Sequence, residues 1–166
     1  MKQRIENEYK STPDIDYEEI IISVINEVID FVKCPYECEV YVTLVDNNTI
    51  QILNKEQRNL DKPTDVLSFP MIEYSAPGDF TEVEDDMSLF NPESGELMLG
   101  DIVISYDKVI SQAEEYNHSQ KRELAFLTAH SMLHLFGFDH ISDDERTEME
   151  KTQNIILKNL GITRED

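Results

Sequence analysis

The chain has few of the features that mark secreted or membrane proteins. Its only cysteines are Cys34 and Cys38, which cannot form the disulfide framework of a small secreted domain. No segment approaches the roughly 18–20 consecutive apolar residues of a membrane-spanning helix. Residues 1–6 also lack the apolar stretch of a signal peptide. We therefore expect a cytoplasmic protein that does not insert into a membrane.

Basic residues are scarce as well. The chain carries 14 Lys and Arg residues against 35 Asp and Glu residues, a formal net charge of −21. As a sum, this charge argues against nucleic acids or anionic membranes as partners, because both are polyanions. The acids are unevenly distributed, however. Residues 73–96 contain eight acidic and no basic residues, whereas residues 53–65 contain three of each.

A length of 166 residues with 40% apolar residues is typical of a single domain, here residues 1–166. Alternating, β-branched patterns predict strands at 38–45, 65–71 and 97–105, and residues 1–10 fit a short edge strand. Apolar spacing and capping residues predict helices over 16–32, 50–57, 106–116, 119–136 and 142–160. The helix over 119–136 is apolar on most sides, as a central, buried helix is. The acidic segment 73–96 is expected to be a solvated, mobile loop.

Three of the four histidines lie within eleven residues, from His130 to His140. His130 and His134 are four residues apart on the buried helix, so their imidazoles stand one turn apart on one face. Gly137 is placed to end that helix in a left-handed conformation, after which the chain can return and present His140. Three His ligands leave one position of a tetrahedral Zn²⁺ ion open for water, which favours a catalytic site.

The same histidine spacing, with Gly137 in register, occurs in the metzincin proteases. Those enzymes carry a Glu general base directly after the first histidine, whereas this chain has Ser131 there. A serine hydroxyl is not a base at neutral pH, so peptide hydrolysis by that route is disfavoured. Outside this cluster, Cys34 and Cys38 are interpreted as free thiols, and the isolated His118 as a surface or capping residue.

The segment from His130 to His140 resembles the signature of the YbeY family of single-strand-specific endoribonucleases, His-Gly-x-Leu-His-Leu-x-Gly-Tyr-Asp-His. The chain matches it at all three histidines and at Leu133, Leu135, Gly137 and Asp139, while Ser131 replaces Gly and Phe138 replaces Tyr. Two further segments, 54–70 and 99–105, are similar to the other signatures of the family. The resemblance covers roughly residues 38–160.

This resemblance implies an α+β fold, with a mixed sheet of about four strands, five or so helices and a central helix that carries the ligands. It implies one Zn²⁺ held by His130, His134 and His140, and an active-site arginine at Arg58. It also implies cleavage of single-stranded RNA in 16S rRNA 3′-end maturation and ribosome quality control, with the small ribosomal subunit or its associated proteins as partners.

The hypothesis from the sequence is therefore a zinc-dependent endoribonuclease, in which Arg58 holds the scissile phosphate. Either water or the RNA 2′-hydroxyl is the attacking group, and Ser131, Asp101 and Asp139 are near the motifs without being assigned as a base. Two alternatives stay open: a non-catalytic ribosome-assembly factor with a structural zinc, and a zinc hydrolase acting on another substrate. A zinc deaminase is disfavoured because its Cys-x-x-Cys ligands are absent.

The charge distribution is compatible with this hypothesis. The segments that bear the motifs, 53–65 and 105–130, are near neutral, and the acidic excess lies elsewhere. The net charge therefore predicts a weak, local grip on RNA, with protein partners contributing to substrate delivery.

Overall fold

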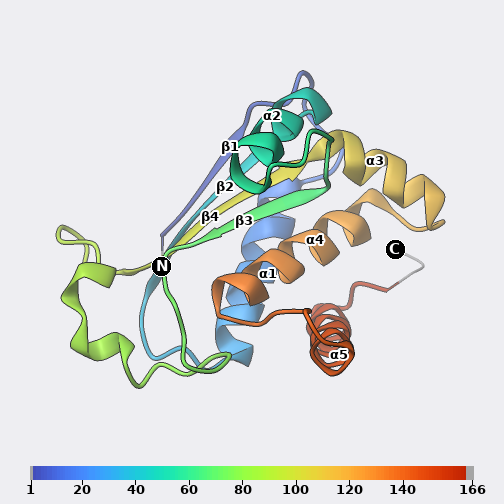
Figure 1. Ribbon diagram of the computed structural model, residues 1–166. Coiled ribbons are helices and arrows are strands. Elements are labelled where there is room, and N and C mark those ends of the chain that lie inside the picture. Colours follow the sequence, from blue (N-terminus) through green and yellow to red (C-terminus); the bar gives the residue numbers. More distant parts are fainter. Residues whose placement is uncertain (1, 164–166) are drawn as a thin grey trace.

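A four-stranded mixed sheet forms the centre of the computed structural model, which describes residues 2–163 (Figure 1). The strands are β1 (Lys2–Asn7), β2 (Cys38–Val45), β3 (Val66–Pro70) and β4 (Leu97–Ser105). Their order across the sheet is β1-β2-β4-β3. β1 and β4 run parallel to β2, and β3 pairs antiparallel with β4. The predicted α+β class and four-stranded mixed sheet are confirmed, with β1 as the expected edge strand.

Five α-helices surround this sheet within the described residues: α1 (Tyr17–Phe31), α2 (Asn47–Arg58), α3 (Tyr106–Glu115), α4 (Gln120–Leu135) and α5 (Asp143–Asn159). The capping residues predicted for α1 and α5 are found at their N-termini. Asp16 accepts a hydrogen bond from the Glu19 backbone N–H, and Ser142 and Glu145 form a reciprocal capping box. None of the helices in residues 2–163 is long and apolar enough to cross a membrane.

Helices α1 and α4 pack on one another beneath the sheet and supply much of the core. The apolar face of α1, including Ile21, Val24 and Val28, is fully buried. A smaller apolar cluster of Val45, Ile50 and Leu67 holds α2 against the sheet, separately from the main core. Because α4 lies between the sheet, α1 and α5, its position and orientation are fixed from several sides. The prediction of a central, buried helix is confirmed.

At Gly100 the backbone of β4 lies unusually close to the backbone of β3. The pairing of β2 with β4 shifts by one residue at Glu39 and Val40, where Gly100 follows an unpaired Leu99. Gly100 has φ +137°, and a Cβ atom there would lie 2.2 Å from the carbonyl oxygen of Phe69. The sheet therefore needs glycine at this position, as the sequence pattern around 100 and 101 indicates.

The acidic segment 73–96 differs from the loop that the sequence predicts. It contains two short 3₁₀ helices, η1 (Val83–Asp85) and η2 (Met87–Leu89), at the end of the sheet away from α2 and α3 (Figure 1). Val83 is buried in the core, and Phe80 packs edge-on against Tyr74 and Phe136. The expectation of a solvated loop is wrong for these apolar side chains. Most of its acids are exposed, while its aromatic rings anchor the segment.

Candidate functional site

The end of α4 places the three clustered histidines. Gly137 (φ +94°) follows the helix, with its N–H donating to the carbonyl of His134 and the Phe138 N–H donating to the carbonyl of Leu133. These two bonds form a Schellman motif, which reverses the chain direction. A Cβ at position 137 would lie 3.0 Å from Tyr74 Cδ2, so the turn is also packed tightly. The predicted left-handed glycine is confirmed.

After this turn the chain brings His140 back beside the helix. The ring centroids of His130 and His140 are 5.5 Å apart, and those of His134 and His140 are 5.0 Å apart. Each histidine offers a nitrogen atom, and these three atoms lie within 4.8 Å of one another. His130 and His134 are half-buried, and His140 is exposed. The structure thus brings together all three histidines that the sequence singles out.

The donor atoms of this group suit a metal ion. Nε2 of His130 and Nε2 of His134 are 3.0 Å apart, close to the ~3.3 Å that separates two nitrogens sharing a tetrahedral ion at roughly 2.0–2.1 Å. Nδ1 of His134 lies 2.9 Å from the carbonyl oxygen of Phe138. We assign the proton to Nδ1, which leaves the Nε2 lone pair facing the other two rings.

Burial keeps the two helix histidines neutral. The pKa of His130 is lowered to about 4, first by burial and then by its neighbours His134 and His140. Burial also lowers the pKa of His134. A neutral imidazole is the form that binds a metal, so these side chains are ready to act as ligands at neutral pH. Gln153, buried on α5, lies beside His130 and acts as a hydrogen-bonding neighbour that raises the pKa of His130, against the larger effect of burial.

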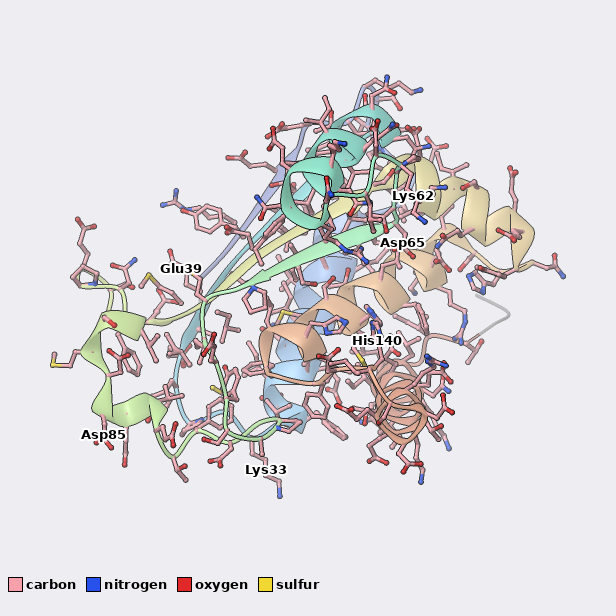
Figure 2. All side chains as sticks on the ribbon, in the orientation of Figure 1. Lys33, Glu39, Lys62, Asp65, Asp85 and His140 are labelled. Atoms are coloured by element: carbon pink, nitrogen blue, oxygen red, sulfur yellow. The ribbon has the colours of Figure 1, made fainter. Side chains whose placement is uncertain are left out.

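A cavity of about 870 Å³ lies in front of the histidines. Its walls come from the end of α2, from β3 and the residues after it, and from the turn that follows α4. Figure 2 shows Asp65 at the start of β3 and His140 beyond the end of α4, both of which line this space. Polar groups dominate the lining near the histidines: Arg58, Thr64, Asp65, Ser68, Glu73 and Asp139.

Arg58, the last residue of α2, lines the same cavity as the three histidines. Within residues 2–163 it makes no ion pair with Asp61, whose carboxylate instead accepts a hydrogen bond from Gln51. Asn54 donates to the carbonyl of Lys62, which ties the segment after α2 back to the helix. The guanidinium is therefore exposed and available to a ligand.

Of the three candidate bases that the sequence leaves unassigned, only one lies in the cavity wall. Asp139 lines the cavity, whereas Ser131 and Asp101 are not part of its wall. The Ser131 side chain is fully buried and its hydroxyl lacks a hydrogen-bond partner. Sequence reasoning missed Glu73 as a lining residue and gave Asp65 no role. Asp65 precedes β3 and Glu73 follows it. Because β3 belongs to the motif segment 54–70, the position of these two acids beside it could have identified them.

Two other sequence interpretations are resolved by the structure. Cys34 and Cys38 are free thiols, as expected, with their sulfur atoms 3.5 Å apart. His118 is not a surface residue: its side chain is only 8% exposed and its Nε2 lies 2.7 Å from Oε1 of Glu123. The surface prediction is wrong because the short connection between α3 and α4 folds His118 inward, against the first turn of α4.

Comparisons with known proteins agree with this site. Residues 4–161 match the family model described as endoribonuclease YbeY. The chain is 54% identical to endoribonuclease YbeY of Lachnospira eligens, over 99% of this chain and 100% of that protein. It is 42% identical to endoribonuclease YbeY of Thermoanaerobacter pseudethanolicus, over 96% of this chain and 98% of that protein.

The fold has a counterpart among solved structures. The solution structure of TM1509 from Thermotoga maritima superimposes with a TM-score of 0.55 and 26% sequence identity, covering 95% of this chain and 91% of the other. The family match spans nearly the whole chain and includes the segments that build the cavity. The chain therefore belongs to the endoribonuclease YbeY family.

Proposed function

We propose that this protein is a zinc-dependent endoribonuclease that cleaves single-stranded RNA, in 16S rRNA 3′-end maturation and ribosome quality control. The observation that carries the proposal is the shared cavity, which holds three convergent imidazoles and a free guanidinium. Family membership supports RNA as the substrate. We also infer that the small ribosomal subunit, or its associated proteins, delivers this substrate in the cytoplasm.

His130, His134 and His140 are the proposed ligands. Three imidazoles with no fourth protein ligand in residues 2–163 fit a catalytic zinc site better than a structural one, which four protein ligands normally close. A bound Zn²⁺ supplies a Lewis acid and lowers the pKa of a coordinated water. The absence of a fourth ligand disfavours the alternative of an assembly factor with a purely structural zinc.

Arg58 is the proposed phosphate-binding residue. Its planar guanidinium can donate two parallel hydrogen bonds to the non-bridging oxygens of a phosphodiester. The same charge stabilises negative charge that builds on the phosphate during cleavage. Asp65, Glu73 and Asp139 are the carboxylates of the cavity wall and the candidates for accepting a proton from the attacking hydroxyl.

The zinc assignment is tested by metal analysis of the purified protein and of its His134→Ala variant. We expect one zinc per chain in the parent protein, and loss of both zinc and RNA cleavage in the variant. Full zinc content in His134→Ala, or unchanged cleavage of a single-stranded RNA oligonucleotide, would contradict the proposal. The ends of the products distinguish the attacking group, because attack by the 2′-hydroxyl leaves a 2′,3′-cyclic phosphate and attack by water does not.

The role of Arg58 has a matched control on the same helix. Lys55 is exposed on the last turn of α2 but does not line the cavity. We expect Arg58→Ala to lower the cleavage rate by about 100-fold or more with zinc content unchanged, and Lys55→Ala to have little effect. Equal losses in the two variants would show only a general contribution of positive charge.

A further inference from the structure

A second cavity, of about 590 Å³, lies along the N-terminal half of α4. Its walls come from the end of α3, the connection that follows, α4 and α5. The side chains that matter for its chemistry are Tyr116, His118, Arg122, Phe126, Glu150 and Asn154. Its volume is within the range of roughly 300–1,000 Å³ that small-molecule pockets occupy.

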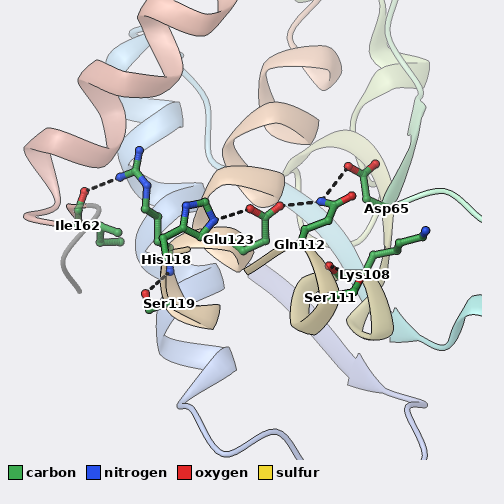
Figure 3. Close-up of polar contacts among 9 residues, drawn as sticks. Asp65, Lys108, Ser111, Gln112, His118, Ser119, Glu123 and Ile162 are labelled. Carbon is green, nitrogen blue, oxygen red and sulfur yellow. Dashed lines mark hydrogen bonds and ion pairs between the residues drawn. The ribbon is translucent and has the colours of Figure 1, made fainter. Parts of the chain in front are cut away.

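A chain of polar contacts forms one side of this cavity (Figure 3). Glu123, only 3% exposed, contacts Nε2 of His118 through one carboxylate oxygen and accepts from Gln112 through the other, both at 2.7 Å. The same Gln112 nitrogen lies 3.4 Å from Oδ2 of Asp65. Gln112 thus links the carboxylates of Glu123 and Asp65, and their positions are fixed relative to each other.

This series of polar contacts ends at His118, whose Nδ1 has no hydrogen-bond partner. The His118 side chain is more than nine-tenths buried. Buried polar atoms in native proteins are normally paired, so this unpaired nitrogen is an unusual feature beside the cavity.

The second cavity adjoins the histidine cavity. Asp65 lines both of them. Phe126 and His130 are one turn apart on α4, which corresponds to about 6 Å along the helix axis. A single strand held at Arg58 and the histidines therefore has its neighbouring nucleotides within reach of the second cavity.

Charge and shape restrict the ligand. The lining contains three carboxylates, on Asp65, Glu123 and Glu150, against the single guanidinium of Arg122, which is unfavourable for a phosphate. The three-histidine group is the only described cluster whose ligand atoms lie close enough for a metal, so a cation is not favoured either. The rings of Tyr116 and Phe126 instead suit a flat, neutral group that donates hydrogen bonds.

Nucleobases in single-stranded RNA are recognised by stacking on aromatic or guanidinium planes and by hydrogen bonds to their edges. Carboxylates accept from the amino group of cytosine, and carboxamides pair with adenine. We propose that the second cavity binds the base of a nucleotide flanking the cleaved bond and selects a base with an exocyclic amino group over uracil. This inference rests on the proposed endoribonuclease function, for which it defines sequence preference.

The test uses oligouridine strands that carry one adenosine, moved through the positions around the cleaved bond. At the position that favours adenosine, inosine then replaces it, which exchanges the amino group for a carbonyl. We expect the cleavage efficiency, kcat/KM, to fall about tenfold on this exchange. Glu150→Ala, at an exposed position of α5, removes a hydrogen-bond acceptor from the wall and is expected to reduce the preference while uridine-only RNA is cut normally. Lys151→Ala, at a position that does not line the cavity, is the control.

A second measurement does not require cleavage. Adenosine and inosine are titrated into the His134→Ala variant, and the backbone amide resonances of residues 116–127 are followed by NMR. Shifts caused by adenosine and not by inosine support the proposal. Cleavage of RNA without any base preference, together with no nucleoside binding, would overturn it. Absence of all RNA cleavage would instead refute the proposed function, while the titration still reports on the cavity.

Discussion

Nε2 of His130 and Nε2 of His134 face each other at 3.0 Å on consecutive turns of α4. Because Nδ1 of His134 is paired with the Phe138 carbonyl, the Nε2 lone pair of His134 faces Nε2 of His130. Metal binding by both nitrogens requires that His130 also carries its proton on Nδ1. Gln153, which raises the pKa of His130 as a hydrogen-bonding neighbour, is the side chain that we expect to accept that proton.

Gln153→Met tests this orienting contact. We expect the variant to fold, because methionine has a similar length and is apolar, and to bind zinc about 10–100-fold more weakly. The measurement is a competition titration with a chelator of known affinity. Thr152→Val, its buried neighbour on α5, is the control. Unchanged zinc affinity in Gln153→Met would show that the histidine pair needs no support from α5.

The stability of the metal-free protein is expected to depend on the protonation of His130. The pKa of His130 is lowered to about 4 by burial and by the neighbouring histidines, against about 6.5 in an unfolded chain. The unfolded state therefore binds more protons between these values, and stability falls as the pH drops from about 6.5 to about 4. The maximal contribution is about 3 kcal/mol. Urea unfolding of the metal-free protein and of its His130→Asn variant at several pH values isolates the contribution of His130. Identical pH profiles of the unfolding free energy in the two proteins would contradict the prediction.

Ser131→Ala is expected to stabilise the protein. The Ser131 hydroxyl is fully buried and unpaired, so its removal relieves a desolvation cost, and alanine also has the higher helix propensity. The free energy of unfolding should rise by about 1 kcal/mol. Chemical denaturation measures the difference. Destabilisation would mean that the hydroxyl is paired in solution.

Gly100→Ala is expected to destabilise the sheet severely. The added Cβ would lie 2.2 Å from the Phe69 carbonyl oxygen, so β3 and β4 have to separate locally, at a cost of about 3 kcal/mol. Gly95→Ala is the control, since Gly95 also has a positive φ (+77°) but no atom within 4 Å of the added carbon. Similar losses of stability in both variants would assign the cost to backbone conformation alone.

The two thiols are expected to react at different rates. The hydrogen bond from Cys38 lowers the pKa of Cys34, whereas that bond and burial raise the pKa of Cys38. Cys34 is also partly exposed, and Cys38 is only 1% exposed. Iodoacetamide should therefore modify Cys34 first in the native protein. Peptide mass mapping at short times measures this order, and preferential labelling of Cys38 would reverse the assignment.

The sequence predicts those parts of the structure that depend on local periodicity. The strands at 38–45 and 97–105 and the caps at Asp16 and Ser142 are found as predicted, because alternation and capping are short-range effects. The three histidines are also brought together as their spacing indicates. The same pattern contains Gly137, which predicts the turn that brings His140 back to the helix.

What the sequence did not predict depends on contacts between distant segments. Val83 and Phe80 have no regular spacing, so their packing against the core was hidden within an acidic segment. His118 is an exception, because the contact that accompanies its burial is local: its partner Glu123 is only five residues away, in the first turn of α4. Arg58 shares a cavity with the histidines only because of where the end of α2 lies relative to α4.

The location of His130 and His134 in the last two turns of α4 has a further electrostatic consequence. The carbonyl groups at a helix C-terminus carry a partial negative charge, which favours cations and disfavours anions. The end of α4 therefore attracts the proposed metal but repels an RNA phosphate when the metal is absent. A metal held by His130, His134 and His140 would reverse the sign of the local potential, so that the same helix end would favour the phosphodiester.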